Sequence, residues 1–139
     1  MATSNRDRIG KALDEVRDAL LPYISINLSE FIGSNWSDQS QASHSNLNDV
    51  SVLLSLLMTH WASVFKKLLS LSDRSYISEL KEARNKWAHS EAMSSDDVDR
   101  YLDTAIRLCR NINATKQTES LRRIREELQQ QIFSERVRY

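Results

Sequence analysis

The sequence contains very little glycine and proline, with two glycines and one proline among 139 residues. Tight turns between the strands of β-sandwiches and β-barrels depend on these residues, so both fold classes are disfavoured. Leucine, alanine, glutamate and arginine are frequent instead, and all of them favour helices. The length is sufficient for one buried core. We therefore expect a single all-α domain.

Cysteine and long apolar runs are scarce as well. Cys109 is the sole cysteine, which excludes an intramolecular disulfide and is typical of a reducing compartment. No apolar run approaches the roughly 20 residues that span a bilayer, and the N-terminus carries charges where a signal peptide needs an apolar segment. We therefore expect a cytoplasmic protein without a membrane partner.

An excess of either charge is also absent, because 19 basic and 19 acidic residues cancel. Strong non-specific binding to nucleic acid depends on a positive field over the whole domain. Any contact with nucleic acid must therefore come from a local patch, and otherwise the neutral balance favours protein partners.

Apolar residues recur at steps of three and four in several segments, and this spacing predicts about five helices. The expected helices cover residues 4–32, 49–69, 75–89, 94–113 and 121–139. Pro22 predicts a kink or a break in the first helix, and the polar stretch 33–48 predicts a long loop anchored by Trp36. We expect an up-and-down bundle over residues 1–115. Residues 116–139 then form an amphipathic helix that leads into a longer parent protein or docks on a partner.

The third expected helix places a charged residue among core side chains. Arg84 follows Leu80 by four positions and precedes Trp87 by three, so a regular helix directs it inward with them. A buried guanidinium without a partner is strongly destabilising, so Arg84 must meet a carboxylate, backbone carbonyls or an anion such as phosphate. The structural alternative to a functional role is an ion pair with an acidic residue, namely Asp49, Asp99 or Asp103.

Two further polar residues follow Arg84 on the same helix. His89 lies about 140° around the helix and about 7.5 Å along it, and Asn85 is a neighbour of His89 because four positions separate them. A cation, an amide and a titratable imidazole are thus expected to share one polar sector at the helix end. The structural alternative for His89 is a capping role near the negative end of the helix dipole.

The segment RNKWAH, residues 84–89, resembles the Arg-x4-His signature of the HEPN superfamily. The longer stretch YISELKEARNKWAHSEAMSSDDVDRYLDTAIRLCRNINA is similar to the Swt-like branch, and DVSVLLSLLMTHWASVF fits the central helix of that branch. The similarity extends over roughly residues 6–114. It implies a HEPN helical bundle, often a homodimer that places two such motifs near the cleft between the subunits.

Many HEPN proteins are metal-independent endoribonucleases, so the resemblance implies an RNA-directed hydrolase without a cofactor or metal. His89 is then the acid or base, Arg84 binds the scissile phosphate, and Asn85 positions the substrate or the histidine. Lys86 and Trp87 are further candidates for contact with RNA, although Trp87 also fits the apolar stripe of the core. This hypothesis requires the guanidinium and the imidazole to share one accessible pocket.

The Swt-like branch commonly lies at the N-terminus of large ATPases and other multidomain proteins, including those of phage defence. A second hypothesis is therefore a non-catalytic dimerisation or protein-interaction module of a larger protein. Other candidate residues carry less weight, because His44, His60 and Cys109 lack the spacing of metal ligands. The arginines near the C-terminus are interpreted as a solvated face, with a polynucleotide track as the alternative.

Overall fold

The computed structural model of the chain describes residues 3–39 and 44–137. Its helices are α1 (Asn5–Phe31), α2 (Trp36–Gln39), α3 (Val50–Thr59), α4 (Leu71–Ala88), α5 (Ser95–Asn111) and α6 (Thr115–Arg136), with 3-10 turns at His44–Asn48 and Phe65–Lys67. No strand occurs within the described ranges. The prediction of an all-α bundle with about five main helices is confirmed.

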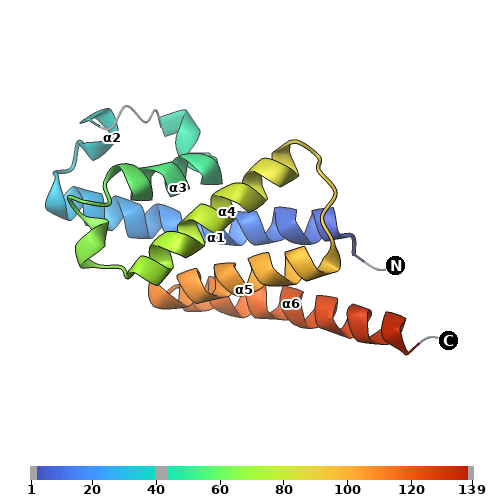
Figure 1. Cartoon of the computed structure of the whole chain (residues 1–139). Coiled ribbons are helices and arrows are strands. Elements are labelled where there is room, and N and C mark those ends of the chain that lie inside the picture. The colour runs from blue at the N-terminus through green and yellow to red at the C-terminus, as the bar shows by residue number, and fades with distance from the viewer. Residues whose placement is uncertain (1–2, 40–43, 138–139) are drawn as a thin grey trace.

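The five longer helices surround a single apolar core. Figure 1 shows α5 and α6 running antiparallel side by side, while α4 crosses α1 and α3 lies along the C-terminal half of α1. The first turn of α1 and the last turn of α6 lie at the same end of the bundle. The fully covered core side chains are mostly leucine and isoleucine, among them Leu20, Ile24, Leu28, Leu53, Leu54, Leu57, Phe65, Ile77, Leu102, Leu108, Leu121 and Leu128. None of the described helices is long and apolar enough to cross a membrane.

Helix α1 continues through Pro22 without a break. Proline lacks the amide proton that would bond the carbonyl of Asp18, four residues earlier. Both residues are exposed, so water can satisfy that carbonyl. The helix therefore loses one hydrogen bond without ending, and the alternative of a break at this position is wrong.

The polar stretch 33–48 is more regular than a loop. It contains α2 and the 3-10 turn at His44–Asn48, while residues 40–43 lie outside the described part of the chain. Trp36 is 5% exposed, so the segment is anchored to the core as expected. Burial of this indole, together with the partly buried Leu47, holds a polar segment against the bundle, and the sequence pattern therefore underestimated its local structure.

The segment expected as one helix over residues 49–69 is divided. Asp49 caps α3 through its side chain, as a helix start requires, but α3 ends at Thr59. The following turns still bury four of their apolar residues, namely Trp61, Val64, Phe65 and Leu69. Tight turns of nearly helical pitch keep the same side of the chain inward, so the apolar spacing does not reveal the change. The continuous helix predicted beyond Thr59 is wrong.

Helix α4 begins at Leu71, four residues earlier than expected, because Ser70 and Asp73 form a capping box. The Ser70 hydroxyl accepts from the Asp73 amide at 3.1 Å, and the Asp73 carboxylate accepts from the Ser70 amide at 2.9 Å. The second carboxylate oxygen of Asp73 accepts from Asn111 at 2.7 Å. The start of α4 is thereby tied to the end of α5.

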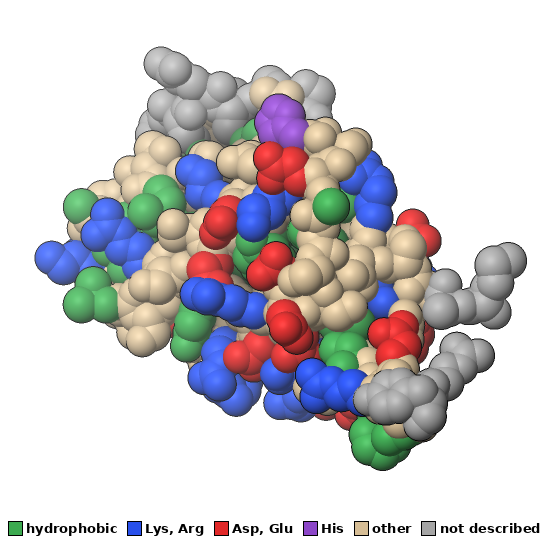
Figure 2. All heavy atoms as spheres, turned by 45° about the vertical axis from the view of Figure 1, so that its right-hand side comes forward, with side chains coloured by type: hydrophobic (Ala, Val, Ile, Leu, Met, Phe, Trp, Pro, Cys, Tyr) green, Lys and Arg blue, Asp and Glu red, His purple; other side chains and the backbone are tan. Residues whose placement is uncertain are grey.

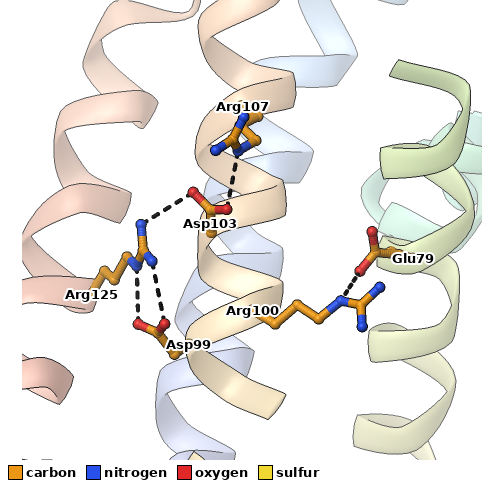
Figure 3. Close-up of polar contacts among 6 residues, drawn as sticks. All are labelled: Glu79, Asp99, Arg100, Asp103, Arg107 and Arg125. Atoms are coloured by element: carbon orange, nitrogen blue, oxygen red, sulfur yellow. Dashed lines mark hydrogen bonds and ion pairs between the residues drawn. The ribbon is translucent and has the colours of Figure 1, made fainter. Parts of the chain in front are cut away.

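Helix α6 is joined to the bundle by arginines as well as by apolar contacts. Figure 3 shows Arg125 between Asp99 and Asp103 of α5, with nitrogen to oxygen distances of 3.0 to 3.2 Å. Arg8 of α1 is 1% exposed and donates to Glu127 at 3.2 Å and also to Gln131. These contacts fix α6 to both α5 and α1, and it begins at Thr115, so the polar stretch expected to precede it is helical.

Candidate functional site

Arg84 lies at the edge of the bundle and not within its core. Its side chain is 27% exposed, and its Nη2 donates to Asp49 Oδ2 at 3.1 Å. The other two acidic residues expected as partners, Asp99 and Asp103, bind Arg125 instead. The ion pair connects the C-terminal half of α4 to the start of α3, which confirms the structural alternative for one of the guanidinium nitrogens.

The Asp49 side chain both caps α3 and forms the ion pair with Arg84 of α4. Its Oδ1 accepts from the amide and the hydroxyl of Ser51 at 2.9 and 2.8 Å, and its Oδ2 accepts from Arg84. Burial opposes ionisation of this carboxyl, but the hydrogen bonds from Ser51 and the Arg84 charge outweigh it and lower its pKa. Arg84 keeps Nε and Nη1 without a hydrogen-bond partner in the described part of the chain, so donors remain for a ligand.

A hollow of about 390 Å³ opens beside Arg84, between α1, the start of α3 and α4. We call it the Arg84 hollow. Its lining mixes apolar and polar residues: Gly10, Leu13, Asp14, Arg17, Asn48, Asp49, Val50, Arg84 and Trp87. Sequence reasoning missed the α1 members of this set, because Asp14 and Arg17 are three residues apart on an exposed face and resemble an ordinary surface pair.

His89 is the C-cap residue of α4, and its backbone amide closes the helix by donating to the carbonyl of Asn85 at 3.0 Å. The next residue, Ser90, takes a left-handed conformation with φ of 55° and turns the chain away. The imidazole is exposed and has no bonded partner among the residues that the structure describes. The backbone therefore performs the capping, which leaves the ring nitrogens available.

A second hollow of about 520 Å³ lies beside the imidazole. We call it the His89 hollow. It is lined mainly by polar residues of α4 and the turn after it: Met58, Ser78, Lys81, Glu82, Asn85, Lys86, His89 and Glu91. The structure thus brings His89 together with Asn85 and Lys86, as the spacing of four and three residues predicts.

The structure does not bring Arg84 into this group. Arg84 lines one hollow, and Asn85 and His89 line the other. The helical angle of about 140° between Arg84 and His89 is the physical reason, because it directs the arginine toward α1 and the start of α3 and the histidine toward Met58 near the end of α3. The expectation that all three groups share one pocket is wrong for a single chain.

Lys86 and Trp87, the two additional candidates for RNA contact, differ in their surroundings. The Lys86 ammonium lies 5.7 Å from the Tyr101 ring and 3.7 Å from Glu82. A hydrogen bond to Tyr101 is the main reason that the pKa of Lys86 is raised, so the lysine is charged at neutral pH. Lys86 therefore adds a positive charge to the lining of the His89 hollow.

Trp87 packs against α1 and lines the Arg84 hollow. The Arg6 guanidinium lies over the indole at 5.0 Å and donates to the Trp87 carbonyl at 2.7 Å. Gly10 permits this close packing, because a Cβ there would lie 3.2 Å from the indole nitrogen. Trp87 therefore packs partly against the core, as its place in the apolar stripe predicts, and the rest of its side chain faces the Arg84 hollow.

Charge around these hollows is mixed in sign. On the face shown in Figure 2, lysine and arginine alternate with aspartate and glutamate instead of forming a patch of one sign. In the described ranges no cluster of three or more His, Cys, Asp or Glu residues has the arrangement of a metal site.

A comparison with protein-family models matches residues 11–113 to the Swt1-like HEPN family. The chain belongs to this family. In this HEPN domain the matched range begins within α1 and ends before α6, so it includes most of the lining of the Arg84 hollow and all of the His89 hollow. No curated protein and no solved structure matches the chain.

Proposed function

We propose that this HEPN domain is an RNA-directed, metal-independent endoribonuclease whose site forms between two copies of the chain. The observation that carries the proposal is the exposed His89 imidazole beside Asn85 and Lys86, in an open hollow at the end of α4. Arg84 and His89 of one chain line different hollows, which favours a site that takes the two groups from different chains. A symmetric pairing of the α4 ends supplies Arg84 from one copy and His89 from the other.

The reaction needs no group beyond the RNA and these side chains. His89 accepts the proton of a ribose 2′-hydroxyl, and that oxygen attacks the adjacent phosphorus. The bond from phosphorus to the 5′-oxygen breaks, which leaves a 2′,3′-cyclic phosphate on one product and a 5′-hydroxyl on the other after protonation by water or by the His89 imidazolium. Arg84 stabilises the charge that develops on the phosphoryl oxygens, and Asn85 orients the imidazole.

The test uses single-stranded RNA of mixed sequence, labelled at one end and incubated with the protein in EDTA. We expect cleavage by the wild type, and loss of cleavage in Arg84→Ala and in His89→Ala. Arg100→Ala is the matched control, because Arg100 also forms a surface ion pair, with Glu79 at 2.7 Å, but lines neither hollow (Figure 3). Absence of cleavage by the folded wild-type protein would refute the nuclease proposal.

Mixing the two inactive variants tests the arrangement between chains. In a mixed dimer one of the two shared sites has both Arg84 and His89 intact, so random pairing restores about a quarter of the wild-type rate. A site within one chain predicts no restoration, because neither variant has both groups. Cleavage by the wild type without restoration in the mixture would contradict the shared site but not the proposed nuclease activity.

The second candidate function is a non-catalytic dimerisation or interaction module in a larger protein, such as an ATPase or a phage-defence protein. The ion pair between Arg84 and Asp49 favours this candidate, because it gives the arginine a structural role without RNA. Residues 116–139 remain proposed as the connection to such a parent protein or as a docking helix, and the cytoplasm remains the proposed compartment. Retained dimerisation without RNA cleavage would support this alternative.

A further inference from the structure

We propose that the Arg84 hollow is a binding pocket for a nucleobase, and specifically for guanine. The proposal deepens the proposed function and rests on it for the assumption that RNA is the ligand. The hollow would hold the base adjacent to the phosphate that Arg84 contacts. The argument depends on the size of the hollow, on the balance of its charges and on the hydrogen-bonding groups that remain available within it.

The size and composition of the Arg84 hollow are those of a small-molecule site. Its volume of about 390 Å³ lies within the range of about 300 to 1,000 Å³ that is usual for ligand pockets. Leu13, Val50 and Trp87 contribute apolar surface, to which the flat faces of a base are suited. The indole is held in place before any ligand arrives, because Arg6 lies over it and Gly10 allows it to pack against α1.

The charges of the hollow favour a neutral ligand with both donors and acceptors. Two arginines and two aspartates line it, so their formal charges cancel. An isolated phosphate there would meet the carboxylates of Asp14 and Asp49, and a cation would meet the guanidinium groups of Arg17 and Arg84. A nucleobase is uncharged and carries donors and acceptors along its edges, so it matches both kinds of group.

The groups that remain available select guanine among the bases. The Asp14 side chain is 65% exposed, and its described contact is a weak one to Arg17 at 3.3 Å. That carboxylate can accept from the ring N–H and the amino group of guanine. Arg84 retains Nε and Nη1, so one of them can donate to the guanine oxygen or to N7 while the other donates to the adjacent phosphate. Adenine lacks the carbonyl and the ring N–H, so it satisfies neither residue fully.

The test measures binding without cleavage, so it is independent of the nuclease assay. The probes are GMP, AMP, CMP, UMP and inorganic phosphate, added to 15N-labelled protein while the indole N–H signal of Trp87 is followed. A Trp87→Phe variant identifies that signal among the three tryptophans. We expect GMP to shift the signal saturably and to bind about tenfold more tightly than AMP. Equal binding of AMP, or of phosphate, would overturn the guanine pocket.

Two aspartates of α1 provide a matched pair of variants. Both Asp14 and Asp18 contact Arg17 at 3.3 Å, but only Asp14 lines the hollow. Asp14→Asn should weaken GMP binding about tenfold, and Asp18→Asn should leave it unchanged. Equal effects of the two changes would contradict the proposal. His89→Ala should abolish cleavage yet bind GMP normally, which separates failure of the pocket from failure of the proposed function.

Discussion

Asp49 has two structural roles, as the cap of α3 and as the ion-pair partner of Arg84, and substitutions can separate them. Asp49→Ala removes both, Asp49→Ser retains a capping oxygen but removes the pair, and Arg84→Gln removes the pair alone. A cap contributes about 1 kcal/mol, and an ion pair with side chains 27% and 41% exposed contributes at most about 1 kcal/mol. We therefore expect losses of about 1 to 2 kcal/mol for Asp49→Ala and at most about 1 kcal/mol for the other two.

Urea and thermal unfolding followed by circular dichroism measure these differences. For a domain of this size the expected decrease in Tm is about 3 to 8 °C for Asp49→Ala and less than about 4 °C for Asp49→Ser and Arg84→Gln. The pKa of Asp49 is lowered in the folded state, so its contribution is complete above its unfolded pKa of 3.8 and is lost as the pH falls through the folded pKa. The difference between Asp49→Ala and the wild type should therefore shrink in acid.

One result would refute this reasoning. If Arg84→Gln destabilised the domain more than Asp49→Ala does, the arginine would have a structural role larger than its ion pair. Loss of cleavage in Arg84→Ala would then not report on catalysis. A small effect of Arg84→Gln, in contrast, shows that the arginine can be replaced in a folded domain and that the cleavage and binding assays are interpretable.

Three further predictions concern positions outside the two hollows. Pro22→Ala should stabilise the domain by about 1 to 3 kcal/mol in urea unfolding, because it restores a helical hydrogen bond at an exposed position, and a loss of stability would contradict this. Burial raises the pKa of the Cys109 thiol to about 12, so at pH 8 Ellman's reagent should react only after urea is added. Rapid labelling of the folded protein would show that this thiol is accessible. Arg8→Met should reduce amide hydrogen-exchange protection in α6 more than in α5, because Arg8 donates to Glu127 and Gln131 of α6, and equal losses in both helices would argue against this role.

The class of fold and most helix positions follow from the order of the amino acids. Apolar spacing and capping residues act within a few positions along the chain, so they are visible without coordinates. The segment 94–113, expected as a helix, shows this, since the apolar residues that recur in it at helical spacing are buried, namely Val98, Tyr101, Leu102, Ala105, Ile106, Cys109 and Ile112. The motif of residues 84–89 was equally visible, and so was the neighbouring position of Asn85 and His89.

Where the helices end, and which partners the motif residues contact, depend on how the helices pack together. Whether α3 stops at Thr59, or α1 continues through Pro22, depends on packing and solvent exposure that periodicity does not report. Three acidic residues were candidate partners of Arg84. In the folded chain Arg125 of α6 pairs with Asp99 and Asp103, and Arg84 pairs with the third candidate, Asp49. A side chain's partner depends on which elements pack beside it. Residues distant in sequence, such as Asp14, can therefore line the site although no sequence pattern indicates it.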